Sequence, residues 1–210
     1  MHIERLTLNG HIDAPLMQVH FSRYVWALSR CVGKSVLDAG CGVGYGTWIV
    51  STVADNVIGI DIAPDAIAEA RQMFGDQSYF QVPLEECDTD PFDVVLAFEM
   101  VEHCADVDLA LEKVKSLLKA DGRAYISLPL HLPNKYHHFR DYGYAEWREI
   151  VERYFTVDSV YYQPMEDEPD TTVCILPAGY QVDGRFVEDW HECRMKDEPP
   201  TGILLFEVRA

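Results

Sequence analysis

The sequence predicts an α/β protein with a doubly wound, mostly parallel sheet and helices on both faces. Two observations predict this fold class. Short apolar runs that suit strands alternate with longer segments that suit helices, as in parallel sheets with helical crossovers. The run Phe92–Phe98 is apolar almost throughout, as a central strand buried on both faces should be. For a chain of 210 residues we expect one domain, with residues 1–33 as a helical cover and residues 164–200 as an insertion and candidate lid.

Each element is predicted from its own local pattern. Apolar residues at helical spacing predict a first helix over Ala14–Cys31. The remaining helices are expected at residues 45–53, 64–75, 107–118 and 144–154. The strands are expected at residues 36–37, 56–61, 78–82, 92–98, 124–128, 156–163 and 202–209. Asp121-Gly122 is expected to form the turn that leads into the strand starting at Ala124.

A glycine-rich loop after the first strand is the most informative part of the chain. Gly40, Gly42 and Gly44 stand at alternate positions, so the backbone can turn sharply and come close to a ligand. The helix that begins at Tyr45 directs its unpaired N–H groups to the same place, which suits a carboxylate or a phosphate. Asp61 ends the next strand, near the spacing at which an acid binds ribose hydroxyls. The loop and the acid together predict a nucleoside-bearing cofactor.

The spacing of the glycines separates two candidate cofactors. A dinucleotide loop has the pattern G-x-G-x-x-G, but the third glycine position is occupied here by Tyr45 or Thr47, which disfavours NAD. The pattern D-x-G-x-G-x-G, which starts at Asp38, resembles motif I of the class I S-adenosylmethionine-dependent methyltransferases. That resemblance implies a Rossmann-like fold and S-adenosylmethionine as the cofactor. A tight strand–helix turn that binds nothing is the alternative.

The resemblance also implies a set of cofactor-binding residues. Asp38 is expected to help hold the methionine end, and Asp61 the ribose. Leu84 stands where this family usually has an acid after the third strand, so adenine recognition is assigned to Glu85. The complete expected set is Asp38, Gly40, Cys41, Gly42, Gly44, Asp61, Ile62, Glu85 and Phe98.

A second group of polar residues follows the fourth strand. If the chain turns helically there, Glu99, Glu102 and His103 share one face at positions i, i+3 and i+4. The segment resembles the E-x-x-E-H segment of ubiquinone-type O-methyltransferases, some small-molecule N-methyltransferases and small-RNA ribose methyltransferases. We therefore expect His103 to act as the base or to orient the acceptor. Glu99 or Glu102 would fix the tautomer of His103 or hold a cationic amine.

Two other interpretations of this segment stay open. Glu102-His103 could cap the following helix and contact only the backbone. Alternatively, the three residues could bind magnesium or manganese with His131, His137 or His138 as a further ligand. The favoured interpretation has no metal.

The composition of the chain favours some classes of methyl acceptor over others. The formal net charge is −18, whereas nucleic-acid binders usually present a basic face, so a small-molecule acceptor (a sugar, lipid precursor or natural product) is expected. The alternatives are metal-assisted RNA ribose 2′-O-methylation and a non-catalytic cofactor-binding module. Neither a leader nor an apolar run of about 18 residues is evident, so a cytoplasmic protein is expected. The six cysteines lack a C-x-x-C pair and are expected to be reduced. A homodimer is a further expectation.

Overall fold

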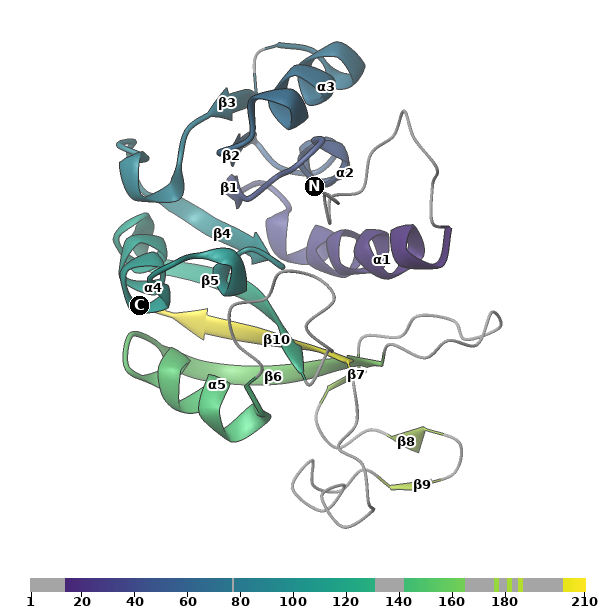
Figure 1. The fold of residues 1–210 in the computed structure, drawn as a ribbon, viewed down its shortest axis with the longest axis vertical. Helices are drawn as coiled ribbons and strands as arrows, with labels where there is room; N and C mark the ends of the chain where they lie inside the picture. Colours follow the sequence, from purple (N-terminus) through teal and green to yellow (C-terminus); the bar gives the residue numbers. More distant parts are fainter. Residues whose placement is uncertain are drawn as a thin grey trace.

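The computed structural model describes residues 14–76, 78–130, 142–164 and 202–210, with short strands at 176–177, 181–182 and 185–186. Within this part of the chain, eight strands form one sheet in the order β3-β2-β1-β4-β5-β10-β6-β7, and β8 and β9 pair separately (Figure 1). Pairing is parallel from β3 to β5. β10 runs antiparallel to both β5 and β6. The predicted α/β class with a mostly parallel sheet is confirmed.

Most elements begin and end within two residues of their predicted bounds. The helices are α1 (Ala14–Cys31), α2 (Tyr45–Ser51), α3 (Pro64–Phe74), α4 (Val107–Ser116) and α5 (Tyr144–Glu152), with 3-10 turns η1 (Leu84–Glu86) and η2 (Val101–His103). The strands are β1 (Ser35–Ala39), β2 (Asn56–Asp61), β3 (Tyr79–Gln81), β4 (Phe92–Phe98), β5 (Leu118–Leu130), β6 (Thr156–Pro164), β7 (Leu176–Pro177), β8 (Gln181–Val182), β9 (Arg185–Phe186) and β10 (Gly202–Arg209).

The start of β5 corrects one prediction. The expected turn at Asp121-Gly122 lies inside the strand, which begins at Leu118. The register against β4 shifts there, because Phe92 pairs with Leu118 and the next paired residue, Val94, lies opposite Arg123. A Cβ on Gly122 would lie 3.0 Å from the carbonyl oxygen of Phe92. The glycine therefore permits a close backbone approach within an irregular strand, and its turn signal does not end the strand.

The core lies on both faces of the sheet. Side chains alternate along each strand, so Val94 and Leu96 pack on one face while Val95 and Ala97 pack on the other. The first face is covered by α1, α2 and part of α3, and the second by α4 and α5 (Figure 1). The predicted helices on both faces are thus confirmed, and the site must lie at one end of the strands.

Some predictions fall on residues outside this description. Residues 1–13 and most of 165–201 are among them, so the candidate lid stays a prediction, and the N-terminal cover is described only from Ala14. Four of the six cysteines are described, and no disulfide joins them. Among the described helices, none has the length and apolar content that crossing a bilayer would require.

Candidate active site

Three strands end together around the glycine loop. β1 lies between β2 and β4 in the sheet, so the ends of these strands meet where the strand order reverses, a position at which open α/β sheets bind ligands. After β1, the N–H groups of Gly40 and Cys41 both donate to the Ile60 carbonyl, at 2.8 and 2.9 Å. The loop is thereby held against the end of β2, and α2 begins directly after it.

Two of the predicted glycines are required by their surroundings as well as by their backbone. Gly40 has φ +79°, and a Cβ there would lie 2.5 Å from Met100 Cγ. Gly44 has φ +85°, and a Cβ there would lie 2.6 Å from Ala70 Cβ. Met100, which packs against Gly40, was not predicted, because its only sequence signal is its place after the fourth strand. A side chain at either position would clash with these neighbours, so both glycines are required for the loop to pack as it does.

Asp61 lies beside the loop, as the sequence predicts. Its Oδ2 accepts from the Gly42 N–H at 2.9 Å, and its Oδ1 accepts from the Ala63 N–H at 2.8 Å. Each carboxylate oxygen can accept a second hydrogen bond, so Asp61 retains capacity for ribose hydroxyls. Ile62 follows it and is 70% exposed, which is unusual for isoleucine and leaves an apolar surface at the end of β2.

The residues expected at the adenine end lie between β3 and β4. The Val82 N–H donates to the Asp61 carbonyl at 3.1 Å, so the chain entering η1 runs alongside the end of β2. Within η1, Leu84 is buried and Glu85 is exposed. Glu85 as an adenine ligand stays a prediction.

Asp38 lies beneath the loop and is completely buried. Its Oδ1 accepts from the Tyr24 hydroxyl at 3.1 Å, and its Oδ2 accepts from Thr47 Oγ1 at 2.6 Å. Burial raises the pKa of Asp38 to about 6, although both hydrogen bonds oppose that rise. Asp38 therefore joins α1 to α2 below the loop, while its expected contact with the methionine end stays a prediction.

Arg23 of α1 is a site residue that the sequence reasoning missed. Its side chain is 1% exposed, and its Nη1 donates to Gln163 Oε1 at 2.8 Å. Among the described residues, no hydrogen-bond partner reaches its Nε or Nη2. Burial raises the pKa of Tyr45, and the positive charge of Arg23 opposes the rise, so the guanidinium lies near the start of α2. The only sequence signal for Arg23 was its place beside Tyr24, one of the apolar positions that predict the first helix.

The shared face predicted for Glu99, Glu102 and His103 is wrong. Glu99 has φ +49°, the one positive φ among the described non-glycine residues, so no helix runs through it. Its N–H donates to Ser127 Oγ at 2.9 Å, and Ser127 Oγ donates to Glu99 Oε1 at 2.7 Å. This reciprocal contact with β5 holds Glu99 outside η2. The chain turns helically only from Val101 onward.

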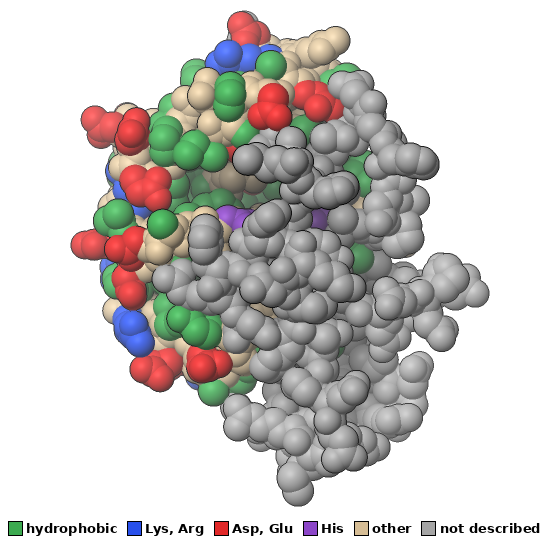
Figure 2. All heavy atoms as spheres, viewed as in Figure 1, with side chains coloured by type: hydrophobic (Ala, Val, Ile, Leu, Met, Phe, Trp, Pro, Cys, Tyr) green, Lys and Arg blue, Asp and Glu red, His purple; other side chains and the backbone are tan. Residues whose placement is uncertain are grey.

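Glu102 and His103 are neighbours that differ in their exposure to solvent. Glu102 is completely buried, and its Oε1 lies 3.9 Å from Nε2 of His103, whose side chain is 36% exposed. The alternative that this pair caps α4 is also wrong, because Asp106 is the N-cap and accepts from the Leu109 N–H at 3.0 Å. His103 is therefore the most exposed member of the segment, Glu99 is partly exposed and Glu102 is buried. Figure 2 shows histidine atoms beside a hollow in this face of the molecule.

The metal alternative gains no support from the described part of the chain. There, no three His, Cys, Asp or Glu side chains are grouped closely enough to bind a metal ion. His131, His137 and His138, which the alternative needs, lie outside the described residues.

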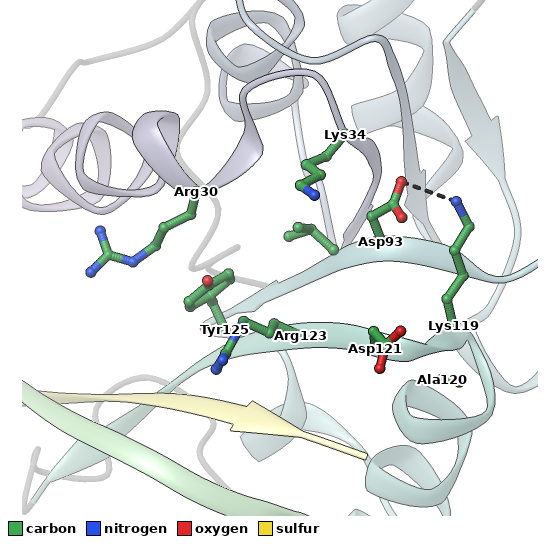
Figure 3. Close-up of a pocket in the computed structure, with 9 residues that line it drawn as sticks. Arg30, Lys34, Asp93, Lys119, Ala120, Asp121, Arg123 and Tyr125 are labelled. Atoms are coloured by element: carbon green, nitrogen blue, oxygen red, sulfur yellow. Dashed lines mark ion pairs between the residues drawn. The ribbon is translucent and has the colours of Figure 1, made fainter.

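A separate pocket lies at the opposite edge of the sheet, where β4 and β5 begin. It has a volume of about 550 Å³, and its lining includes Arg30, Lys34, Asp93, Lys119 and Arg123 (Figure 3). Lys119, Arg123 and Arg30 each contact another side chain of the protein. Lys119 Nζ lies 3.0 Å from Asp93 Oδ2, and the Arg30 guanidinium lies 3.5 Å from the centroid of the Trp26 ring. The pocket is distinct from the loop site and is built from ion pairs that join strands.

Comparison with known proteins decides the family. A family model described as a methyltransferase domain matches residues 20–162. The chain belongs to the class I S-adenosylmethionine-dependent methyltransferases. The match covers α1 to β6, so it includes the glycine loop, Asp61, Arg23 and the segment after β4. The resemblance predicted from motif I is confirmed.

Two curated relatives resemble this methyltransferase over part of their length. A probable S-adenosylmethionine-dependent methyltransferase of Mycobacterium tuberculosis is 30% identical over 133 residues, which are 59% of this chain and 48% of the relative. A ubiquinone biosynthesis O-methyltransferase of Bradyrhizobium diazoefficiens is 36% identical over 113 residues, which are 51% of this chain and 44% of the relative. The chain thus spans about half the length of these relatives.

Solved methyltransferase structures share the fold. The N-methyltransferase NodS of Bradyrhizobium japonicum with S-adenosylhomocysteine aligns with a TM-score of 0.64 and 15% identity, covering 91% of this chain and 87% of NodS. Magnesium protoporphyrin IX methyltransferase of Synechocystis with bound S-adenosylmethionine aligns with a TM-score of 0.62 and 17% identity, covering 99% of this chain and 89% of that one. At these identities the likeness concerns the fold.

Proposed function

We propose that this chain is an S-adenosylmethionine-dependent methyltransferase that acts on an oxygen or nitrogen nucleophile of a small molecule. The observation that carries the proposal is a glycine loop beside the Asp61 carboxylate at the ends of β1 and β2, with the buried Arg23 guanidinium near the start of α2. The glycine loop suits contact through its backbone, Asp61 suits ribose hydroxyls, and the Arg23 guanidinium suits a carboxylate. S-adenosylmethionine carries ribose hydroxyls, a carboxylate and a chain between them that can lie along the loop.

The residues of the site fit that cofactor. Arg23 would bind its carboxylate, since a buried guanidinium whose Nε and Nη2 find no partner within the described chain suits an anionic group. Asp61 would bind the ribose hydroxyls, and Ile62 would pack against the base. Gly40 and Gly44 have positive φ angles, which let the loop take the sharp turn that would follow the methionine chain. When bound, S-adenosylmethionine supplies a methyl group that is already activated on a sulfonium, so the protein has mainly to position the acceptor.

On the acceptor side, His103 would take the proton from a hydroxyl nucleophile. Its exposure gives it access to the acceptor, and Glu102 Oε1 lies 3.9 Å from its Nε2. Glu99 would orient the acceptor or hold a cationic amine from the end of β4. The similarity of this chain to a ubiquinone biosynthesis O-methyltransferase and to an N-methyltransferase supports an O or N acceptor here too.

A small acceptor is favoured over RNA by charge. The chain carries 35 acidic against 17 basic residues, and the phosphate contacts of an RNA acceptor require a basic track. Transfer of labelled methyl groups to RNA but to no small molecule would favour the RNA alternative. Retained turnover in the presence of EDTA would exclude a metal requirement.

Calorimetric titration with S-adenosylhomocysteine tests the cofactor assignment. Asp61→Ala should weaken binding about 10- to 100-fold, because hydrogen bonds to a charged group are lost. Asp55→Ala is the matched control, since Asp55 is exposed just before the other end of β2. Unfolding curves verify that Asp61→Ala still folds without its bond to Gly42. Equal affinities of the wild-type and Asp61→Ala proteins would contradict the assignment.

Turnover of an accepted small molecule tests His103. His103→Ala should lower kcat about 10²- to 10⁴-fold for a hydroxyl acceptor and leave the affinity for S-adenosylhomocysteine unchanged. Unaltered kcat in this variant would remove His103 from the proton transfer.

A further inference from the structure

Gln163, at the end of β6, uses its whole side-chain amide to hold α1. Its Oε1 accepts from Arg23 Nη1 at 2.8 Å. Its Nε2 donates to the Val19 carbonyl at 2.9 Å and to Ser22 Oγ at 2.7 Å. The side chain is completely buried, which is rare for glutamine. Three hydrogen bonds therefore join residues about 140 positions apart in the sequence.

The chemistry of the partners fixes the orientation of this amide. An arginine can only donate, and a backbone carbonyl can only accept. The oxygen of Gln163 must therefore face Arg23, and its nitrogen must face Val19. Because this orientation is set, Gln163 holds one end of the guanidinium, at Nη1, and leaves Nε and Nη2 directed elsewhere.

The choice of glutamine has an electrostatic consequence. A glutamate at this position would pair with Arg23 and neutralise it, whereas the neutral amide orients the guanidinium and leaves its positive charge intact. A buried cation without a counter-charge costs free energy unless an anion binds it. The carboxylate of the cofactor, as assigned to Arg23 in the proposed function, supplies that anion.

We propose that Gln163 is a positioning residue for the cofactor: it orients Arg23 and preserves its charge, so that Nε and Nη2 bind the carboxylate of the methionine moiety. The inference rests on the proposed role of Arg23. It gives β6, on the far side of β10 from the parallel strands, a part in cofactor binding that runs through α1.

The experiment compares two adenosyl ligands by calorimetry. S-adenosylhomocysteine carries the amino-acid group, and 5′-methylthioadenosine lacks it. Gln163→Glu should weaken binding of S-adenosylhomocysteine about tenfold or more, because a second carboxylate competes for Arg23, and should leave binding of 5′-methylthioadenosine unchanged. Gln163→Met, which fills the same volume, should weaken the first ligand selectively because Arg23 is no longer oriented.

Control variants separate positioning from simple stability. Gln18→Leu changes an exposed glutamine of α1, the helix that carries Arg23. It should alter the affinity for neither ligand. In an Arg23→Gln background, Gln163→Glu should no longer affect the affinity for S-adenosylhomocysteine. Should Gln163→Met fail to fold, Gln163→Glu keeps an acceptor for Arg23 and still provides the comparison.

Three outcomes would overturn the inference. The affinity for S-adenosylhomocysteine could be unchanged in Gln163→Glu, both ligands could weaken by the same factor, or the effect could persist without Arg23. Failure of the wild-type protein to bind either ligand is a different result, because it overturns the proposed function itself.

Discussion

Among single residues, Asp38 has an environment that is unusual for a carboxylate. It is completely buried, and the Tyr24 hydroxyl and Thr47 Oγ1 both donate to it. The ring of Tyr24 also lies against Gly46, where a Cβ would come within 2.0 Å of it. One tyrosine of α1 thus contacts both the carboxylate of β1 and the backbone of α2, and this local packing fixes how α1 covers the loop.

The raised pKa of Asp38 predicts a pH dependence of stability. Its pKa is about 6 in the folded protein and about 3.9 when unfolded, so the folded state binds more protons between these values. Its contribution to stability is therefore full below about pH 4 and is lost as the pH rises through about 6. Relative to Asp38→Asn, the wild-type protein should lose roughly 2–3 kcal/mol of unfolding free energy over this range. Urea unfolding at several pH values measures the difference, and a difference independent of pH would contradict the pKa shift.

The contact between Tyr24 and Gly46 predicts a context-dependent substitution. Gly46→Ala should destabilise the wild-type protein by about 1–3 kcal/mol, because the methyl group meets the Tyr24 ring. In a Tyr24→Ala background the same change should be neutral or stabilising, since alanine favours a helix by about 1 kcal/mol over glycine. Urea unfolding of the four proteins measures the coupling. Equal effects in both backgrounds would show that the ring does not occupy this place.

Among the elements, the starts of β1, β4 and β5 are joined by one carboxylate. Asp93 of β4 accepts from the N–H and the hydroxyl of Ser35 at 2.9 and 2.7 Å, and it pairs with Lys119 of β5 (Figure 3). These donors hold the pKa of Asp93 well below its usual range. This group of contacts, Asp93 with Ser35 and Lys119, is called the clamp. It lies at the starts of the strands, opposite the loop site, so it stabilises the sheet without touching the cofactor.

Asp93→Asn should therefore destabilise the protein at neutral pH by about 1–2 kcal/mol. Because the folded pKa is depressed, the stabilisation is present above the unfolded value of about 3.9 and is lost as the pH falls below it. Asp121→Asn is the control, since Asp121 is exposed in the same pocket. Thermal unfolding at neutral and acid pH measures both variants, and equal stabilities at neutral pH would argue against the clamp.

For the whole molecule, the excess of negative charge affects the stability of the folded state. A formal net charge of −18 on 210 residues makes the folded chain repel itself, and salt screens that repulsion. Figure 2 shows acidic side chains spread over the visible described surface, so the repulsion is general to that face.

Raising NaCl from about 0.02 to about 0.3 M should increase Tm by about 2–4 °C at neutral pH, which corresponds to about 1 kcal/mol. The increase should vanish near the isoelectric point, where the net charge is small. Scanning calorimetry measures both series. A fall in Tm with salt at neutral pH would mean that attractive ion pairs outweigh the repulsion.

The sequence by itself determined the fold class, most element bounds, the loop around Gly40–Gly44 and the acid Asp61, because each depends on local periodicity or local backbone demands. Only the tertiary structure decided the rest. Ser127 on a neighbouring strand binds Glu99, which lies outside the predicted helical face, and Gln163 of β6 contacts Arg23 of α1. Tyr24 of α1 contacts Asp38 of β1. Such contacts join residues far apart in the chain, and a hydrogen bond between them leaves no period or spacing from which it can be predicted.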